Sequence, residues 1–252
     1  MDLGLRGKAA IVTGGSRGIG RSIALGLAAE GCNVAICARS EEKLAATAAE
    51  IRVAGVEALG IRADVTRPED IEKVVKGTVA GFGRVDILVN NAGGGWPGED
   101  DDAWQGTVNI NLIAAVRASR LVIPEMRTLG AGRIIHITSI WGREAGGGLP
   151  YNAAKAAMIS HAKNLALQLA PDKITVNSVA PGSIVFPGGG WQRALEADPE
   201  GMAQFIKANI ASRRFGKPEE VADVVVFLAS ERANWVTGAC INVDGGQTRS
   251  NI

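Results

Sequence analysis

The chain has 252 residues, 46% of them hydrophobic and 21% charged, a composition that is ordinary for a globular protein and excludes a disordered one. Lys and Arg number 27 against 26 Asp and Glu, and this net charge of +1 argues against binding to nucleic acid or to a membrane surface. No apolar run approaches the roughly 20 residues that a membrane-spanning helix needs, and the first residues carry no signal-peptide pattern.

Short β-branched runs alternate along the chain with longer segments of helical periodicity. The short runs predict strands at 8–12, 33–38, 58–62, 85–89, 133–137, 174–179 and 240–243. The longer segments predict helices at 19–30, 41–54, 68–82, 103–129, 151–170 and 218–230, the third of them with Thr66 as N-cap and Glu69 completing a capping box. The alternation predicts a single doubly wound α/β domain over residues 1–252, a parallel sheet of about seven strands with helices on both faces.

The cysteines Cys32, Cys37 and Cys240 are odd in number and lack metal-ligand spacing. They indicate reduced thiols, so we expect a cytoplasmic protein without a bound metal.

Glycine makes up 33 of the 252 residues, against a usual share of roughly 7%. It clusters at 14–20, 93–95, 146–148 and 188–190, each time after a predicted strand. These clusters could simply form turns. Because ligands of open parallel sheets bind outside the carboxyl ends of the strands, we favour a ligand cleft with mobile walls.

The segment Thr13 to Gly20 follows the first strand and begins the first helix with the spacing TGxxxGxG. Glycines let the backbone approach a pyrophosphate, and the helix N-terminus supplies unpaired N–H groups. No carboxylate follows the second strand; Arg39 and Ser40 stand there instead, and Arg17 lies in the glycine loop. Two guanidinium groups suit a 2′-phosphate, so we expect NADP(H) rather than NAD(H), although Arg39 could be only a solvated surface charge.

Tyr151 and Lys155 are four residues apart and share one face of a predicted helix. An ammonium near a phenol lowers the phenol pKa, which suits proton exchange with a carbonyl or an alcohol. Tyr151 is also the single tyrosine of the chain, so we interpret the pair as functional.

Three motifs together resemble the short-chain dehydrogenase/reductase (SDR) superfamily: TGGSRGIG at 13–20, NNAG at 90–93 and YNAAK at 151–155. The resemblance runs from about Leu5 to Gly246 and implies a Rossmann-type domain. It also implies catalytic roles for Asn111, Ser139, Tyr151 and Lys155. The cofactor-binding residues that motif and resemblance indicate are Gly14, Ser16, Arg17, Gly18, Ile19, Gly20, Arg39, Ser40, Asp64, Val65, Asn90, Ala92, Gly93, Tyr151, Lys155, Pro181, Gly182 and Ile184.

Some of these assignments have alternatives. Asp64 could cap the turn before Thr66 instead of flanking an adenine. The segment from Ser139 to Tyr151 is one residue shorter than is common in the family, a difference that the glycines at 146–148 could absorb. Phe186 stands where the family often has a threonine that contacts the nicotinamide, so this contact is not carried over.

Four aromatic residues follow the strands at the expected cleft, and with Ser139 they are the expected substrate-binding residues: Trp96, Trp141, Phe186 and Trp191. They could instead pack loops or subunit contacts. As pocket walls they predict a bulky, apolar ketone or secondary alcohol. Trp104 and Trp235 are expected in the core, and His136 and His161 are expected to be structural.

By overall pattern the chain resembles a well-known group of the family, the 3-oxoacyl-acyl-carrier-protein reductases, which bind an acidic carrier through arginines before the fifth and sixth strands. The matching segments here, 129–132 and 171–173, lack those arginines, although Arg127 or Lys173 could compensate. We therefore expect a small-molecule carbonyl reductase, with the carrier-protein reductase as the alternative and a non-catalytic dinucleotide-binding protein as a second one.

The resemblance further implies a homotetramer built through the helices at 103–129 and 151–170. The small residues Ala153, Ala154 and Ala157 could pack against another subunit or against the chain's own sheet. Residues 183–215 are expected to form a lid that excludes water from the site.

Overall fold

The computed structural model describes residues 2–251 and confirms the doubly wound architecture. Within these residues a seven-stranded sheet has the order β3-β2-β1-β4-β5-β6-β7, and all neighbouring strands are parallel. The strands are β1 (Ala9–Thr13), β2 (Asn33–Ala38), β3 (Ala58–Arg62), β4 (Ile87–Asn90), β5 (Gly132–Ile137), β6 (Ile174–Pro181) and β7 (Cys240–Val243). Since the order reverses between β1 and β4, a cleft is expected at the carboxyl ends of these two strands.

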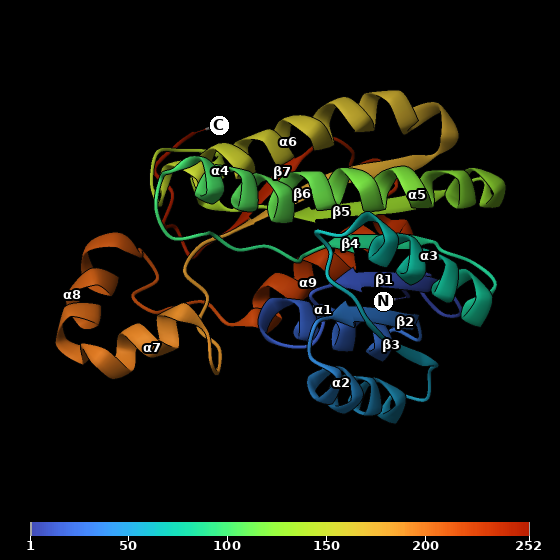
Figure 1. The fold of residues 1–252 in the computed structure, drawn as a ribbon, viewed down its shortest axis with the longest axis horizontal. Helices are drawn as coiled ribbons and strands as arrows, with labels where there is room; N and C mark the ends of the chain where they lie inside the picture. Colours follow the sequence, from blue (N-terminus) through green and yellow to red (C-terminus); the bar gives the residue numbers. More distant parts are fainter. Residues whose placement is uncertain (1, 252) are drawn as a thin grey trace.

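Helices cover both faces of the sheet (Figure 1). One face carries α1 (Gly18–Ala29), α2 (Glu41–Val53) and α9 (Pro218–Ala229), and the other carries α3 (Pro68–Phe82), α5 (Ala114–Leu129) and α6 (Leu149–Leu169). Apolar strand residues alternate between the two resulting cores: Val12 and Ile36 face α1, whereas Ile11 and Ala35 face α3 and α5.

The helix expected at 103–129 is divided into three segments. α4 (Asp101–Val108) runs into a π-helical turn, Asn109–Ile113, before α5 begins. Periodicity alone predicted one continuous helix because all three segments share an axis (Figure 1) and the turn adds no breaking residue. The expected lid contains two helices that glycine and proline obscured in the sequence, α7 (Gly190–Ala197) and α8 (Pro199–Asn209).

The N-cap prediction at Thr66 was wrong by one position. The residue before α3 is Arg67, whose backbone is extended because the following Pro68 disfavours helical geometry there. Thr66 instead donates from its hydroxyl and its amide to Asp64 Oδ1, at 2.7 and 3.0 Å.

The tryptophans expected in the core are exposed, Trp104 by 38% and Trp235 by 98%. On α4 the inward positions are taken by Ala103 and Thr107, so the side chain of Trp104 points away from the core. Val236 packs against the core beneath α9, and its neighbour Trp235 faces outward.

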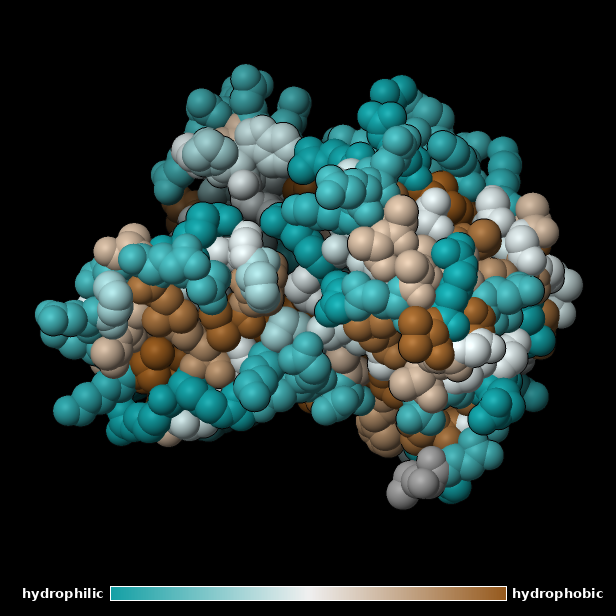
Figure 2. Space-filling model, turned by 90° about the horizontal axis from the view of Figure 1, so that it is seen from below, coloured by the Kyte–Doolittle hydropathy of each residue, from teal (hydrophilic) through white to brown (hydrophobic). Residues whose placement is uncertain are grey.

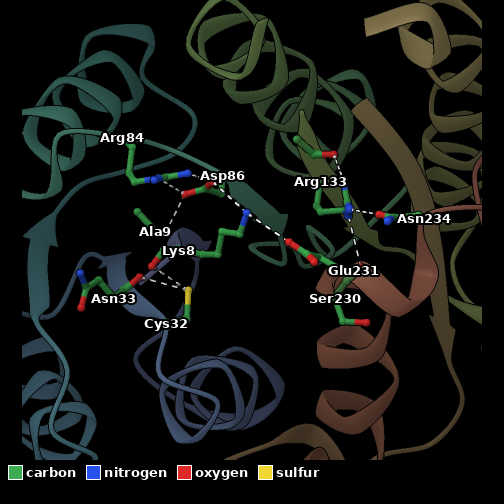
Figure 3. A network of polar contacts seen from close by, with 11 residues as sticks. Lys8, Ala9, Cys32, Asn33, Arg84, Asp86, Arg133, Ser230, Glu231 and Asn234 are labelled. Carbon is green, nitrogen blue, oxygen red and sulfur yellow. Dashed lines mark hydrogen bonds and ion pairs between the residues drawn. The ribbon is translucent and has the colours of Figure 1, made fainter. Parts of the chain in front are cut away.

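A polar network closes the amino-terminal edge of the sheet, opposite the glycine clusters (Figure 3). Asp86 accepts hydrogen bonds from the amide of Ala9 at 2.9 Å and from Arg84 at 2.7 and 2.6 Å. Lys8 lies between Asp86 and Glu231, 3.9 and 3.7 Å from their carboxylates. The network joins β1, β4 and the segment after α9.

No helix in the described part of the chain is both long and apolar enough to cross a membrane. Residues 2–251 also contain no group of three or more His, Cys, Asp or Glu that could hold a metal ion.

Candidate active site

A cavity of about 790 Å³ lies along the carboxyl edge of the sheet. The predicted residues that line it are Gly14, Ser16, Arg17, Ile19, Gly20, Arg39, Ser40, Asp64, Val65, Ala92, Gly93, Trp96, Ser139, Trp141, Tyr151, Lys155, Pro181, Gly182, Ile184, Phe186 and Trp191. Gly18, Asn90 and Asn111 are not among the lining residues. One cavity thus joins the glycine loop to the Tyr–Lys pair.

The glycine loop turns sharply because Gly14 and Gly18 have φ angles of 65° and 53°, which other residues rarely adopt. A side chain at Gly20 would collide with the carbonyl of Gly14, so the loop packs directly on the start of α1. The backbone of the glycine loop therefore leaves space for a phosphate at the N-terminus of α1.

Asn91 holds this loop in place, and the sequence reasoning missed it. Its side-chain amide donates to the carbonyl oxygens of Thr13 and Gly14 at 2.8 and 3.2 Å. The backbone amides of Asn91 and Ala92 both donate to Thr13 Oγ1 at 3.0 Å. Its place in the NNAG motif, directly after Asn90, was the signal that could have identified it.

Positive side chains gather at the end of the cavity formed by β1, β2 and β3. Arg17, Arg39 and Lys43 line it there, the last of these also missed from the sequence, and Ser40 caps α2. Asp64 both lines the cavity and caps the turn through Thr66. Burial raises the pKa of Asp64, but the hydrogen bonds from Thr66 and the nearby Arg39 outweigh it, so the pKa lies below its usual range.

Tyr151 and Lys155 lie on the first turns of α6, as their spacing predicted. Lys155 is 3% exposed, and its Nζ lies 5.5 Å from the centre of the Tyr151 ring. Nζ donates to the carbonyl of Ile137 at 2.9 Å and contacts Met158 Sδ at 3.6 Å. Burial lowers the pKa of Lys155 to about 7.

Ser139 lies two residues after the end of β5, and its hydrogen bond to the Tyr151 phenol lowers the pKa of that phenol. Burial raises the pKa of Tyr151 and exceeds the opposing effect of that hydrogen bond. The sequence argument expected Lys155 to lower this pKa. In the structure burial has the larger effect on this pKa, and the Lys155 ammonium lies 5.5 Å from the centre of the ring.

Asn111 lies in the π-helical turn and is fully buried. Its amide group donates to the carbonyls of Gly94 and Thr107 at 2.6 and 2.8 Å. A side chain at Gly93 would meet Asn111 Oδ1 at 2.6 Å and Lys155 Nζ at 3.2 Å. Gly93 therefore separates Asn111 from Lys155, and only glycine fits between them.

The four aromatic residues also line the cavity, and three of them, Trp96, Trp141 and Trp191, come after β4, β5 and β6. Trp141 meets Tyr151 edge-on, with the ring centres 6.5 Å apart. Gly146 and Gly147 wrap its indole so closely that side chains there would collide with it. These glycines, in the segment that joins Ser139 to Tyr151, therefore leave the space that the Trp141 indole occupies.

Phe186 lies nearer to the glycine loop than the sequence suggested. A side chain at Gly18 would meet its ring at 2.8 Å. Trp191 belongs to an aromatic cluster within residues 183–215, with its ring centre 5.0 Å from those of both Phe205 and Phe215. Figure 2 shows apolar side chains exposed on this α7–α8 lobe, and neither helix contains a buried residue.

A doubly wound sheet with a glycine loop and a buried Tyr–Lys pair in one cavity defines a dinucleotide-dependent dehydrogenase or reductase. The chain belongs to the SDR superfamily and is an oxidoreductase that acts on carbonyl or alcohol groups. The matching family model, described as enoyl-(acyl carrier protein) reductase, covers residues 14–248. A non-catalytic role is therefore set aside.

Several relatives match over nearly their whole length. The 3-oxoacyl-[acyl-carrier-protein] reductase FabG of Staphylococcus epidermidis is 40% identical over 95% of this chain and 98% of its own length. The short-chain reductase NovJ of Streptomyces niveus is 37% identical over 94% and 93%, respectively. Among solved structures, L-sorbose reductase from Gluconobacter frateurii, complexed with NADPH and L-sorbose, has a TM-score of 0.94, 38% identity and coverage of 99% of this chain and 100% of its own.

Proposed function

We propose that the protein uses NADPH to reduce a bulky, largely apolar ketone that is free in solution. The observation that carries this proposal is the division of the cavity. Apart from Lys155, its charged lining residues gather at the ends of β1, β2 and β3, whereas Trp96, Trp141 and Trp191 line the other half. A cofactor phosphate fits the first half and an apolar substrate the second.

Arg17 and Arg39 are the residues proposed to bind the 2′-phosphate, and they favour NADP(H) over NAD(H). The glycine loop and the NNAG segment fit the rest of a dinucleotide, since their backbones leave a cradle that side chains would fill. When bound there, the nicotinamide supplies the hydride. The relative bound to NADPH and L-sorbose is consistent with this preference.

The remaining chemistry is a proton transfer by this chain's own residues. Tyr151 Oη donates a proton to the carbonyl oxygen, and the Ser139 hydroxyl donates a hydrogen bond to the same oxygen. Because burial raises the pKa of Tyr151, the phenol stays protonated near neutral pH, which supports the direction of reduction. Lys155 carries a positive charge beside the phenol as the proton leaves.

The second candidate is a 3-oxoacyl-acyl-carrier-protein reductase, which the FabG relatives favour. The surface argues against it. Arg127, one of the cations that could have replaced the family's arginines, is paired with Asp172 at 2.8 Å. An acidic carrier would have to compete with that carboxylate.

The direct test is NADPH oxidation by the purified protein, with a bulky aryl ketone in one series and acetoacetyl-acyl carrier protein in the other. The proposal expects faster turnover of the ketone, and loss of about 100-fold or more in the Tyr151→Phe variant. Faster turnover of the carrier-bound thioester would make the second candidate the function. Unchanged turnover by Tyr151→Phe would refute the proton-donor role.

We also propose that the protein works as a cytoplasmic homotetramer and that residues 183–215 form the lid. On α6, Ala154 is buried against the chain's own sheet, whereas Ala153 is exposed and available to a second subunit. Sedimentation at several protein concentrations would measure the subunit number; a monomer at micromolar concentration would contradict the tetramer.

A further inference from the structure

The chain's two histidines meet in the core next to the active site. His136 is fully buried on β5, and its Nε2 lies 3.3 Å from Nδ1 of His161 on α6. Its other ring nitrogen, Nδ1, lies 3.1 Å from the side-chain amide nitrogen of Asn90, which is also 3.2 Å from Ser119 Oγ. Four polar side chains therefore form one hydrogen-bonded chain through the interior.

The side chain of Asn90 determines which atom donates and which accepts in each of these hydrogen bonds. An amide nitrogen only donates, so Nδ1 of His136 must accept its hydrogen bond. The proton of a neutral His136 is then on Nε2 and is donated to Nδ1 of His161. Burial, together with the charges of His161 and Lys155, lowers the pKa of His136 to about 3, so the ring is neutral near pH 7.

At one end the hydrogen-bonded chain supports the cofactor side of the site. Asn90 is the last residue of β4 and immediately precedes Asn91, whose amide holds the glycine loop. Ser119 lies on α5, the helix that continues from the π-helical turn of Asn111. A shift of Asn90 would therefore be transmitted to the cofactor cradle.

At the other end it supports the Tyr–Lys pair. His161 is on α6, the helix that carries Tyr151 and Lys155. The residue next to His136 on β5 is Ile137, whose carbonyl accepts the hydrogen bond of Lys155 Nζ at 2.9 Å. The distance between α6 and β5 at the histidines therefore also sets the position of the catalytic ammonium.

We infer that His136 is a positioning residue: its neutral ring, with the proton on Nε2, fixes α6 and the end of β4 against β5 and thereby places Lys155 and Tyr151 for proton transfer. Apolar side chains could fill the same volume, but they would not set a direction or a distance as a hydrogen bond does. Catalytic groups need placement to within about 0.5 Å.

Protonation of His161 would remove the acceptor of the His136 Nε2–H. The side chains bonded to or paired with His136 from β4 and β6 are the uncharged Asn90 and Ser178, and Ser119 on α5 is bonded to Asn90. The charged or titratable groups that act on it, His161 and Lys155, both belong to α6. We therefore expect turnover to fall at acidic pH as His161 gains a proton.

The first test needs no substrate. Because the chain has only two histidines, nitrogen NMR of protein labelled with ¹⁵N-histidine reports on this pair alone, and His161→Asn assigns the two rings. We expect the Nε2–H form for His136 and no titration of its ring between pH 8 and pH 5. An Nδ1–H form, or titration of His136 near its ordinary pKa, would overturn the inference.

The second test separates positioning from stability. His161→Leu removes the acceptor, whereas Oδ1 of His161→Asn can replace Nδ1 without titrating. We expect His161→Leu to lower kcat for ketone reduction at least about tenfold, with little change in the KM for NADPH. His161→Asn should restore kcat and lose the acidic decline. If both variants keep the wild-type kcat and pH profile while Tm falls, or if His161→Asn restores nothing, the pair is only structural.

Discussion

Burial of the Lys155 ammonium lowers the free energy of unfolding, a cost that we attribute to its role in proton transfer. Its Nζ is hydrogen-bonded to the carbonyl of Ile137, contacts the sulfur of Met158 and lies over the Tyr151 ring, with no carboxylate paired to it in residues 2–251. Burial lowers the pKa of Lys155 to about 7 from an ordinary value of 10.5. Between these two pH values the unfolded chain binds a proton that the folded chain has released. The free energy of unfolding should therefore rise with pH across that window, and at pH 7 or below the full penalty applies.

Lys155→Met is accordingly expected to raise the free energy of unfolding at pH 7 by on the order of 2 kcal/mol while abolishing reduction. The gain should shrink toward pH 10, where wild-type Lys155 is neutral in the folded protein. Chemical denaturation at several pH values measures it, with Lys163→Met, an exposed lysine on the same helix, as the matched control. A variant less stable than wild type at pH 7 would contradict the argument.

Arg39 follows β2 and lines the phosphate end of the cavity. Arg39→Ala is expected to raise the KM for NADPH by about 10-fold or more, because a hydrogen-bonded charge pair is lost. The KM for NADH should change little, since NADH has no 2′-phosphate. Arg62→Ala provides the control: this exposed arginine on β3 pairs with Glu41 and does not line the cavity. Equal losses with both cofactors would show that Arg39 does not select the phosphate.

At the scale of elements, both ends of the proposed lid are hydrogen-bonded to one turn after β7. The amide of Ser183, where the lid begins, donates to Gln247 Oε1 at 2.8 Å. The amide of Ser212, near its end, donates to the carbonyl of Gly245 at 2.9 Å. Asp244 closes the turn itself by accepting from the amides of Gly246 and Thr248. The turn is therefore placed to anchor both ends of the proposed lid, so that the lid could move about it as a hinge.

Gln247→Ala is expected to loosen the lid without unfolding the domain. The KM for the ketone should rise about fivefold, the value of one lost hydrogen bond of about 1 kcal/mol. Amide hydrogen exchange over α7 and α8 should become faster, while NADPH affinity stays nearly unchanged. Gln204→Ala on the exposed face of α8 is the control. Unchanged exchange in Gln247→Ala would exclude the hinge role of this residue.

The sequence predicted the strands, most helices and many of the residues that line the cavity because these depend on local patterns: apolar runs, glycine loops and a Tyr–Lys spacing; it did not predict Lys43 or Asn91. It failed where long-range packing decides. The π-helical turn at Asn111 contains no glycine or proline that would mark it in the sequence, and α7 and α8 begin with glycine and proline. The partners of His136, Asn90 on β4 and His161 on α6, are far away in the sequence, as is Ser119 beyond Asn90, so no local pattern could reveal them.

At the scale of the whole molecule, function and stability lie at opposite edges of the sheet. The carboxyl edge holds the cavity and the buried Lys155, whereas the amino edge holds the network around Asp86 (Figure 3). Asp86→Asn should lower the free energy of unfolding by about 2–4 kcal/mol, since it leaves Arg84 without its paired charge and weakens the bond to Ala9. Because the network does not touch the cavity, kcat should stay within about twofold of wild type; a large loss of kcat in folded protein would contradict this separation.

The two histidines should also make the whole domain sensitive to mild acid. The pKa of His136 is about 3 in the folded protein, lowered by burial and by its neighbours, and burial lowers the pKa of His161 as well. Below about pH 6.5 the unfolded chain takes up protons that the folded chain excludes, so stability falls as the pH falls. For His136 alone, the free energy of unfolding should fall by about 2 kcal/mol between pH 6.5 and pH 5.

This loss can be measured by urea denaturation between pH 8 and pH 5, above the range in which the carboxylates titrate. The slope of the free energy of unfolding against pH should approach about 1.4 kcal/mol per pH unit for each histidine that is neutral in the fold and charged in the unfolded chain. A curve that stays flat down to pH 5 would mean that the interior admits a charged histidine. The hydrogen-bonded chain from Asn90 to His161 would then lack the fixed direction on which the positioning of Lys155 depends.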